Sequence, residues 1–553
     1  MVGRWGWEHL APVMIALSCG LLLLGCETGQ DDPGQRPGGD PEPAAVAPSP
    51  GGTVVIAFPT EPDVLNPLIR VSSYTGQILS LLLDGVMEMG EDLVWRPRIA
   101  HSYTLAPDSL AVTYHLRPWV WADGIPLTAH DLAVTFELLK SPEVASPLRG
   151  QHDAVIRAVV LDSLTIRYEL QRVVPDPIGR TVTTILPSHI VSQLDPTQVQ
   201  TWPLNQNPLS SGPFVLESWT HNHELVLVPN PLYPGDRPHL ERVIFRIIPD
   251  ESARVMALEA GDVDFMEDLP IQAASRLQGR DDILVQKISG RLFGYLSWNF
   301  RNPLFSDRKT RKALSLAIDR SRFVDGLLGG FAKPAASPLP PALWAHNPAV
   351  QPDPYEPERA RQLLAEAGWQ DGDADGILDR EGISFEFEIL TRHGDPVREN
   401  GVVIIRENLR DVGVRVKPRV LEHATALDLI RSGEFDAYLG LFAVNLLVDP
   451  SPLIHSRATD RYNHGHYANA LVDSLLAEAL ASPDRDITRP IWYRLQEVLA
   501  EDQPMAFLYY PETLIGTSRR LQGVRPHILS PFNNICEWWI DPADRKFASG
   551  NRR

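Results

Sequence analysis

Residues 110–139 read LAVTYHLRPWVWADGIPLTAHDLAVTFELL, and this stretch decides the fold. In its second half, Thr128 and Asp131 have the spacing of a capping box, which marks the first turn of a helix. Apolar side chains then follow on one helical face: Leu132, Phe136 and Leu139. The stretch therefore predicts a helix with one face in a core.

Strand-like and helix-like segments alternate through the rest of the chain. Predicted strands are Thr53–Phe58, Val243–Ile248 and the alternating segment Phe385–Leu390. Predicted helices run from Pro357 to a stop at Gly368, from Asp307 to Asp319 and from Leu471 to Leu480. This alternation predicts the α/β class.

Size and charge limit the classes of protein that the chain can represent. At 553 residues it exceeds the roughly 250–300 residues of a single hydrophobic core, so we expect two or three domains. The formal net charge of −19 repels phosphate backbones and argues against nucleic acid as the main partner.

The N-terminus predicts export. Arg4 precedes an apolar run, Leu10–Leu24, which at about 15 residues is shorter than the ~20 needed to span a bilayer and fits a signal peptide. Leu23-Leu24-Gly25-Cys26 resembles the lipobox of bacterial lipoproteins, which implies lipidation of Cys26 and a membrane anchor; a conventional cleaved secretion signal is the alternative. The mature chain would keep two cysteines, Cys26 and Cys536, which excludes a disulfide framework.

Residues 27–51 are rich in proline, glycine and acids and have almost no large apolar side chain. Such a segment cannot bury enough surface to order itself, so it predicts a tether between the anchor and the folded part.

Several segments, in order along the mature chain, resemble the family 5 extracellular solute-binding proteins, which carry oligopeptides, dipeptides and nickel. Residues 110–139 give the longest match, as a strand, a turn containing Asp-Gly and the capped helix. Further matches are Glu61–Pro67, Ser211–Phe214, Asn230–Met266, Trp298–Phe300, Arg311–Arg320 and Arg361–Asp379.

The resemblance implies an α/β fold of the periplasmic-binding-protein type II class, in its large three-domain variant, with two lobes closing on a central cleft. We expect a signal peptide (1–26), a tether (27–51), a discontinuous domain I (52–90, 208–295 and 506–545), an inserted domain II (91–207) and domain III (296–505).

The implied function is that of an extracytoplasmic solute-binding lipoprotein of an ABC importer, acting at the periplasm or cell surface. We expect a monomer that binds a peptide or another small solute, needs no cofactor and delivers the solute to permease and ATPase subunits. Two alternatives stay open: a lipid-anchored sensor or chaperone-like binding protein, and a lipid-anchored hydrolase. The motifs G-x-S-x-G, H-E-x-x-H and the P-loop are absent from the sequence, which argues against an enzyme.

Matching to the family also implies ligand-binding residues. In its peptide carriers, an aspartate three residues before an acidic-Pro pair binds the amino terminus of the peptide; here the pair is Asp449-Pro450 and the matching position is Leu446. An ammonium buried without a counter-charge costs several kcal/mol, so free-peptide binding in that mode is in doubt. The implied contacts are Glu61, Asn66, Tyr74, Trp298, Asn299, Phe442, Asn445 and Tyr510.

No metal site is predicted, although two segments contain residue types that bind metals. Asp371, Asp373 and Asp375 resemble the first half of an EF-hand loop, but position 12 is Gly382 instead of glutamate. His464 and His466 could present imidazoles, yet paired histidines in a polar loop are more often plain surface groups.

Overall fold

The computed structural model describes residues 47–546. The predicted signal peptide, Cys26 and most of the tether lie outside the described residues. Within residues 47–546, no helix has the length and apolar character needed to cross a membrane.

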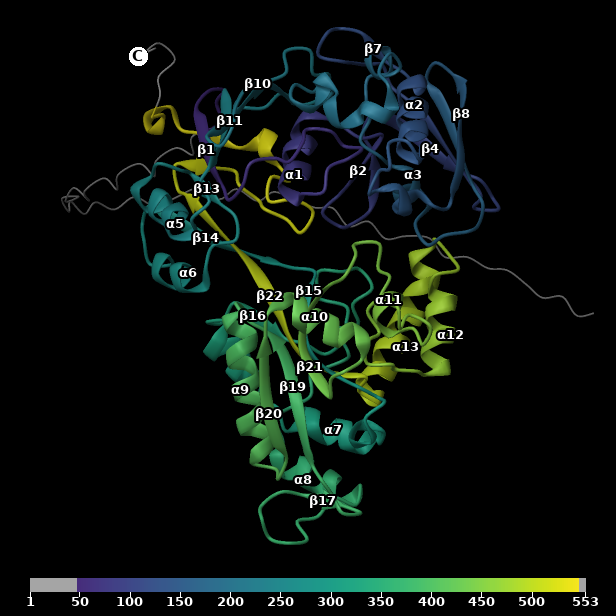
Figure 1. The fold of residues 1–553 in the computed structure, drawn as a ribbon. Helices are drawn as coiled ribbons and strands as arrows, with labels where there is room; N and C mark the ends of the chain where they lie inside the picture. The colour runs from purple at the N-terminus through teal and green to yellow at the C-terminus, as the bar shows by residue number, and fades with distance from the viewer. Residues whose placement is uncertain (1–46, 547–553) are drawn as a thin grey trace, which may run out of the picture. The chain divides into compact units, whose positions relative to one another are not determined.

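One mixed sheet links two groups of elements, which we call the first and second lobes (Figure 1). Its strand order is β10-β11-β12-β1-β13-β22-β15-β21-β19-β20, and β14 and β16 also pair with β22. The strands are β1 (Thr53–Phe58), β10 (Phe214–Thr220), β11 (Glu224–Pro229), β12 (Arg242–Ile247), β13 (Phe265–Met266), β14 (Ile283–Ser289), β15 (Leu292–Trp298), β16 (Ala332–Pro334), β19 (Glu386–Arg392), β20 (Arg415–Leu421), β21 (Ala437–Ala443) and β22 (Met505–Ser518).

Strand β22 belongs to both lobes. Its first half pairs with β15 and β16, and its second half pairs with β13 and β14. The chain also crosses between lobes at Gly290 and Arg291, which join β14 to β15. A β-carbon at Gly290 would lie 3.3 Å from the carbonyl oxygen of Pro511 in β22, so the two connections touch.

In the first lobe, the predicted strand Thr53–Phe58 is confirmed as β1, and both of its faces are buried. Val55 and Ala57 pack in an apolar cluster with helices α5 (Glu251–Ala260) and α6 (Ile271–Leu277). Ile56 and Phe58 pack on the opposite face with helix α1 (Ser73–Leu82). Alternate side chains of β1 thus pack into two different apolar clusters, one on each face of the sheet. This is the arrangement expected of a strand that is covered on both faces.

The stretch 110–139 folds as its pattern predicts. It contains β5 (Ala111–Leu116), β6 (Trp119–Val120), β7 (Pro126–Leu127) and helix α2 (Ala129–Lys140). The capping box is confirmed, because the Thr128 backbone N–H donates to Asp131 Oδ2 at 2.7 Å. Leu132, Phe136 and Leu139 are all buried. Helix α2 packs on the second sheet of the first lobe, whose order is β4-β5-β9-β8.

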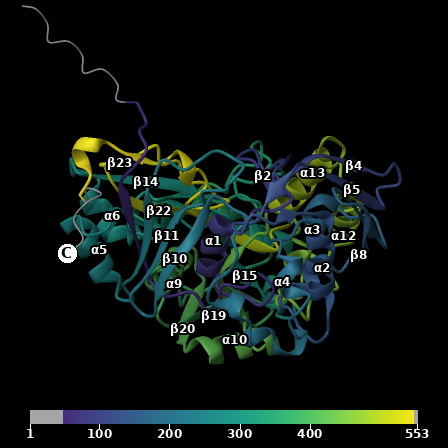
Figure 2. The same ribbon diagram turned by 90° about the horizontal axis from the view of Figure 1, so that it is seen from above.

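The second lobe is built on strands β15, β21, β19 and β20 and carries most of the later helices. They are α7 (Arg308–Leu316), α8 (Pro357–Glu366), α9 (Pro396–Arg410), α10 (His423–Ser432), α11 (Ser451–Ile454), α12 (Ala470–Ala479) and α13 (Arg485–Asp502). The predicted helices at 307–319, 357–368 and 471–480 correspond to α7, α8 and α12. Figures 1 and 2 both place α12 and α13 on the same side of the molecule as the sheet that contains β4 and β8.

The remaining elements are short or connect the main ones. They are β2 (Met87–Met89), β3 (Trp95–Pro97), β4 (Ala100–Leu105), β8 (Val155–Asp162), β9 (Thr165–Leu170), β17 (Asp379–Arg380), β18 (Ile383–Ser384), β23 (Leu521–Gln522), β24 (Trp539–Ile540), α3 (Pro177–Thr181), α4 (Ser188–Val191), a π-helical turn (Arg322–Leu327) and 3₁₀ turns at Arg149–His152, Pro196–Thr201, Pro203–Asn205, Pro303–Phe305, Ile535–Glu537 and Pro542–Asp544.

The three-domain division stays a prediction. The apolar cluster around β1 continues without a break into the sheet of β4, β5, β8 and β9, so the expected domains I and II share one core. The expected border at 295/296 falls inside β15, and the border at 505/506 falls inside β22. Both borders lie in strands because the sheet itself connects the lobes.

Candidate binding cleft

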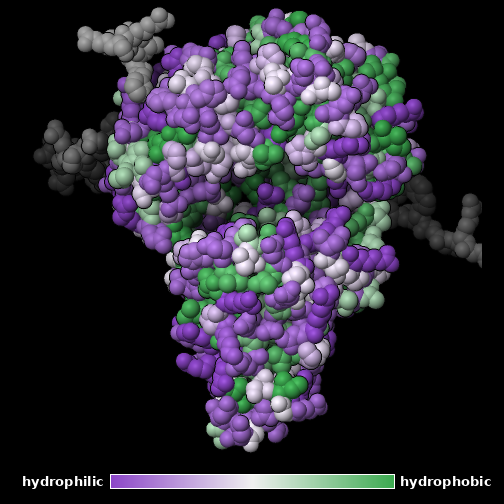
Figure 3. Space-filling model, in the orientation of Figure 1, coloured by the Kyte–Doolittle hydropathy of each residue, from purple (hydrophilic) through white to green (hydrophobic). Residues whose placement is uncertain are grey.

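A cavity of about 1010 Å³ is lined mainly by the first lobe and reaches Leu446 of the second. Its wall comes from α1, the β2–β3 hairpin, the segment 525–537 and, on the side of the second lobe, Leu446. The volume lies at the upper end of the range for small-molecule sites. Figure 3 shows the surface hollowed between the two lobes, with apolar residues inside the hollow.

One part of this wall carries a network of charged and polar side chains, in which Arg98 Nε makes no hydrogen bond to residues 47–546. The Tyr233 hydroxyl donates to Asp84 Oδ2 at 2.9 Å, and Arg98 Nε lies 3.5 Å from Asp84 Oδ1. Burial raises the pKa of Asp84, although Arg98 opposes this shift. Burial alone would lower the pKa of Arg98, but Asp84, Tyr233 and Glu88 outweigh it and raise that pKa. These groups bind each other and shape the wall.

The neighbouring thiol is inert. Burial raises the pKa of Cys536 to about 12, so the sulfur stays protonated and is not a nucleophile at neutral pH. Cys536 therefore contributes packing to the cavity wall.

Three other charged side chains of the wall have no partner. Among residues 47–546, the side chains of Arg70, Asp236 and Arg237 make no hydrogen bond or ion pair. Arg70 is half-buried, and burial lowers the pKa of its guanidinium although the charge of Asp63 opposes this shift. The wall thus offers both signs of charge to a solute.

A second, smaller cavity of about 410 Å³ adjoins the first. Trp95 and Leu446 line both cavities. On one side the smaller cavity is lined by β3, β4 and the start of α3, and on the other by Trp344, residues 446–448 and α13. It therefore lies where the two lobes face each other.

Of the sequence-derived positions, Leu446 is the one that lies at the cavities. The eight implied contact residues do not line either cavity. Their role in binding stays a prediction, and the structure shows a local partner for each.

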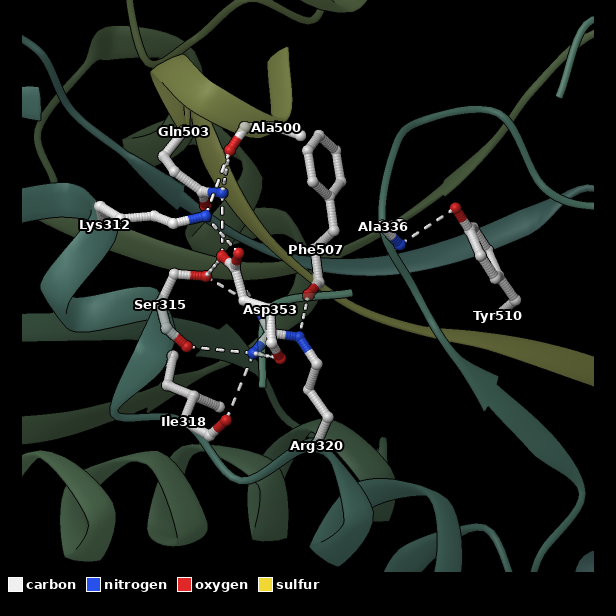
Figure 4. A network of polar contacts seen from close by, with 10 residues as sticks. All are labelled: Lys312, Ser315, Ile318, Arg320, Ala336, Asp353, Ala500, Gln503, Phe507 and Tyr510. Atoms are coloured by element: carbon white, nitrogen blue, oxygen red, sulfur yellow. Dashed lines mark hydrogen bonds and ion pairs between the residues drawn. The ribbon is translucent and has the colours of Figure 1, made fainter. Parts of the chain in front are cut away.

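Four of them hold backbone in place. Asn66 donates to Asn205 Oδ1 at 2.9 Å and accepts from the N–H of Leu68, and Asn299 donates to the carbonyl of Phe435 at 2.7 Å. The Tyr510 hydroxyl accepts from the N–H groups of Ala336 and Ser337, and Figure 4 shows it pointing at Ala336. Asn445 accepts from the N–H of Leu447.

The other four pack or pair locally. Trp298 is fully buried and stacks on Phe305, and Phe442 lies against Phe293 and Tyr462. Tyr74 packs edge-on against Phe58, and its hydroxyl lies 3.4 Å from Asp268 Oδ2. Glu61 accepts from the N–H of Asn222 at 3.0 Å and lies near His221.

The acidic turn is internally bonded. Carboxylate oxygens of Asp371, Asp373 and Asp375 lie within 4.8 Å of one another, and all three residues are exposed. Each also accepts a backbone N–H of the same turn, from Gly376, Asp375 and Ile377 respectively. The turn can form without an ion, and the structure gives no further support for a metal.

The two loop histidines differ from each other. His464 is buried, its Nδ1 has no hydrogen-bond partner among the described residues, and burial lowers its pKa. His466 has a φ of 57° and lies in a turn, and its pKa is also lowered by burial. For both histidines burial thus favours the neutral imidazole, and neither lines a cavity described above.

Sequence reasoning missed most of the cavity wall. Arg70, Trp95, Arg98, Arg237 and Trp344 come from segments far apart in the chain, and none belongs to a motif with a fixed spacing. The local signals that mark helices and strands do not mark residues that meet across a cleft.

Two α/β lobes, joined by β22 and the β14–β15 connection and separated by a large cleft, define a solute-binding protein of the periplasmic type II class. The chain belongs to the bacterial extracellular solute-binding proteins, family 5: residues 94–463 match the model of that family's middle region.

Individual relatives cover nearly the whole chain. The oligopeptide-binding protein AppA of Bacillus subtilis (strain 168) is 28% identical over 90% of this chain and 93% of its own length. Its structure, in complex with a nonapeptide, superimposes with a TM-score of 0.68 over 90% of this chain and 100% of AppA. The probable D,D-dipeptide-binding periplasmic protein DdpA of Escherichia coli (strain K12) is 26% identical over 87% of this chain and 93% of DdpA.

A more distant structure shows the same fold. The substrate-binding protein CtaP of Listeria monocytogenes is 21% identical and superimposes with a TM-score of 0.77 over 89% of this chain and 100% of CtaP.

These findings establish the role of the chain in outline. It is a solute-binding protein of an ABC importer, it works outside the cytoplasm with permease components, and it is not an enzyme. The hydrolase alternative is thereby removed.

Proposed function

We propose that the chain captures a peptide-like solute in the 1010 Å³ cavity and that the lobes close on it before delivery to the permease. The observation that best supports this proposal is the composition of the cavity wall. Unpaired charges of both signs come from the first lobe, at Arg70, Asp236 and Arg237, while the second lobe contributes Leu446.

The wall suits a solute with two charged ends. A peptide-like molecule carries an ammonium and a carboxylate, and both need a counter-charge when they leave water. Arg70 and Arg237 can pair with a carboxylate, and Asp236 can pair with an ammonium. Two relatives support this class: AppA was solved with a nonapeptide, and DdpA is named for dipeptides.

In this proposal the second lobe contacts the solute through the apolar side chain of Leu446. It offers no charge to the amino end of a peptide, so that end lies against the first lobe. The second lobe then contributes burial of apolar surface, which strengthens as the lobes approach and water leaves the cleft.

Closure would use the two connections between the lobes. Among residues 47–546, the chain passes from one lobe to the other within β22 and at the β14–β15 link, and both β14 and β15 pair with β22. In a hinge of this kind, only a few residues change their φ and ψ angles when the lobes move. Gly290, at the β14–β15 link, has the conformational freedom that such a change requires.

The proposal includes the lipid anchor and the three-domain organisation predicted from the sequence. Lipidation of Cys26 and a tether over residues 27–51 would keep the receptor near its permease. Replacing Cys26 by serine and following the protein between membrane and medium tests the anchor. Retention of the variant in the membrane fraction would contradict it.

Native mass spectrometry of protein purified gently from its host tests the solute. We expect a bound mass that matches a peptide or a related zwitterion, and its release on mild unfolding. The Arg70→Ala and Arg237→Ala variants should retain less of it, whereas Arg494→Ala, on the exposed face of α13, serves as the matched control. A bound molecule without charged groups would contradict the proposed solute class.

A further inference from the structure

The segment Leu328–Phe331 belongs to the second lobe and reaches into the first. It joins the π-helical turn, which packs on α9, to β16, which pairs with the first half of β22. Leu328 packs in the apolar cluster of the second lobe. Phe331, only 3% exposed, packs instead with α5 and α6 in an apolar cluster of the first lobe. Among residues 47–546, it is the one buried member of that cluster that the second lobe supplies.

The turn that carries Phe331 fits closely against α6. Gly329 and Gly330 have φ values of 57° and 78°, in the left-handed region that favours glycine. A β-carbon at Gly329 would lie 3.1 Å from Cγ2 of Ile271 in α6, so a larger residue would push the turn away from this helix. The two glycines thus let the chain turn beside α6 and place the ring of Phe331 in the first lobe.

Phe331 is also held by polar contacts. Its carbonyl accepts from the N–H of Glu512 in β22 at 3.0 Å. Lys287 of β14 lies over its ring, with Nζ 5.2 Å from the ring centroid and 3.8 Å from Glu512 Oε2. A cation over an aromatic face is attracted to it, and burial of the ring adds a larger favourable contribution. The first lobe therefore binds the side chain, while β22 binds the backbone.

These contacts lie where the chain crosses between the lobes. Pro511 is the last residue of β22 that pairs with β16, and Glu512 is the first that pairs with β14. Gly290, at the other crossing, lies against the carbonyl of Pro511. Contacts close to a rotation axis change little when two lobes rotate, whereas they are broken when the lobes slide past each other. The Phe331 contacts can therefore persist through a rotation about these crossings.

From this arrangement we propose that Phe331 is a positioning residue for the movement of the lobes. Its ring is a pin, seated in the first lobe, that keeps the rotation axis at Pro511 and Glu512 and prevents the lobes from sliding. The proposal rests on the lobe closure of the proposed function and adds the contact that confines this movement to one axis.

The distribution of distances between the lobes tests the pin. Spin labels are placed at Glu137→Cys in α2 of the first lobe and at Leu471→Cys in α12 of the second, both exposed positions. Double electron–electron resonance is then measured on the full mature chain, with Cys26 replaced by serine and without added solute. Cys536 stays unlabelled at neutral pH, because burial raises the pKa of its thiol to about 12.

Phe331→Ala removes the pin, and Leu277→Ala is the matched control. Leu277 is fully buried in the same cluster but belongs to α6 of the first lobe, so its loss weakens the cluster and leaves the insertion in place. Both variants should have a lower Tm than the labelled parent. We expect Phe331→Ala alone to broaden the distance distribution, by roughly twofold or more, because further relative positions of the lobes become populated. Phe331→Leu should give an intermediate width.

Two results would overturn the inference alone: an unchanged width in Phe331→Ala, or an equal broadening in Leu277→Ala, which would assign the effect to lost stability. Phe331→Leu decides in the same way if Phe331→Ala does not fold. Both results leave the proposed function standing, because they are obtained without solute. If the labelled parent shows the same distances with its co-purified solute and after removal of that solute, the lobes do not close, and the inference and the proposed function fall together.

Discussion

Leu446 is the residue on which the nature of the solute depends. It lines both cavities, where a peptide carrier of the resembled type has an acid. We predict that Leu446→Asp weakens binding of the co-purified solute roughly tenfold or more, because a carboxylate in the apolar wall must be desolvated when the lobes close. Isothermal calorimetry checks this, with Leu471→Asp on exposed α12 as control. A gain in affinity for free tripeptides would instead place their ammonium at residue 446.

Asp353 is the centre of a buried network in the second lobe, shown in Figure 4. It accepts from Ser315 at 2.6 Å and from Gln503 at 2.9 Å, and also binds Lys312. Arg320, only 5% exposed, lies 3.9 Å away, and burial lowers its pKa to about 10.

Removing Asp353 would leave Arg320 as a buried charge without a counter-ion. We predict that Asp353→Ala lowers the free energy of unfolding by about 3–5 kcal/mol, the cost of breaking a buried pair from one side. Urea unfolding followed by tryptophan fluorescence measures it. Asp460→Ala, at an exposed position, should change the midpoint little; equal midpoints for both variants would show that the network is not needed for stability.

Glu267 gives the protein a pH-dependent stability. Burial raises its pKa to about 7, the neighbouring Asp268 adds to the shift, and a hydrogen bond from Gln77 opposes it. The folded state therefore favours the protonated acid, whereas the unfolded chain ionises near its ordinary pKa of 4.5. The folded protein is destabilised as the pH rises from about 4.5 to about 7.

Glu267→Gln removes this ionisation and keeps an acceptor for Gln77. We predict equal stability of variant and wild type at pH 4.5, and a variant more stable by about 1–3 kcal/mol at pH 8. Thermal unfolding across this pH range measures the difference. Glu358→Gln, whose side chain is 82% exposed, should follow wild type throughout; a constant difference at all pH values would disprove the assignment to ionisation.

At the scale of elements, the cap of α2 holds two segments together. Asp131 is buried, and besides the N–H of Thr128 it accepts the N–H of Ser188 at 2.7 Å, at the start of α4. We predict that Asp131→Ala lowers the free energy of unfolding by about 2–4 kcal/mol, because the buried N–H of Ser188 and the half-buried N–H of Thr128 lose their acceptor. Urea unfolding checks this. Glu137→Ala, exposed on the same helix, is the control, and a similarly small effect of both changes would contradict the role of the cap.

The elements were predictable wherever a local signal defines them. The capping box at Thr128, Pro357 at the first turn of α8 and Gly368 beyond its end, at a φ of 87°, each mark a boundary through backbone chemistry. Strand β1 could be recognised because Thr53 is followed by an unbroken run of apolar residues through Phe58. Within such segments a few neighbouring residues determine the conformation.

The cleft was not predictable in the same way. Position 446 could be singled out only through its distance from Asp449-Pro450, whereas Arg70 and Trp344 reach the cavities through tertiary contacts. Conversely, Asn66, Asn299 and Tyr510 are polar side chains that satisfy nearby backbone groups. From the sequence alone, a polar residue that binds backbone cannot be distinguished from one that binds a solute.

At the scale of the molecule, the tip of the β2–β3 hairpin makes a contact between the lobes beside the cleft. Leu93, at the tip between β2 and β3, is 3% exposed and packs into an apolar cluster of the second lobe. Its backbone is in the left-handed region at a φ of 59°, and its carbonyl accepts from Arg485 of α13. A leucine in this conformation is unfavourable, so contacts of the tip must offset the strain.

We predict that Arg485→Gln shifts the protein toward more open conformations, because the variant loses both the bond to Leu93 and the stack on Trp344. Small-angle scattering of the solute-free variant should give a larger radius of gyration than wild type. Its affinity for the co-purified solute should fall roughly three- to tenfold. The solute binds the closed form, and part of its binding free energy is then spent on shifting the variant from the open to the closed form. Arg494→Gln, an exposed arginine of the same helix paired with Glu497, is the control. Unchanged scattering together with unchanged affinity would show that the Leu93–Arg485 contact does not control closure, and would leave β22 and Gly290 as the elements that determine it.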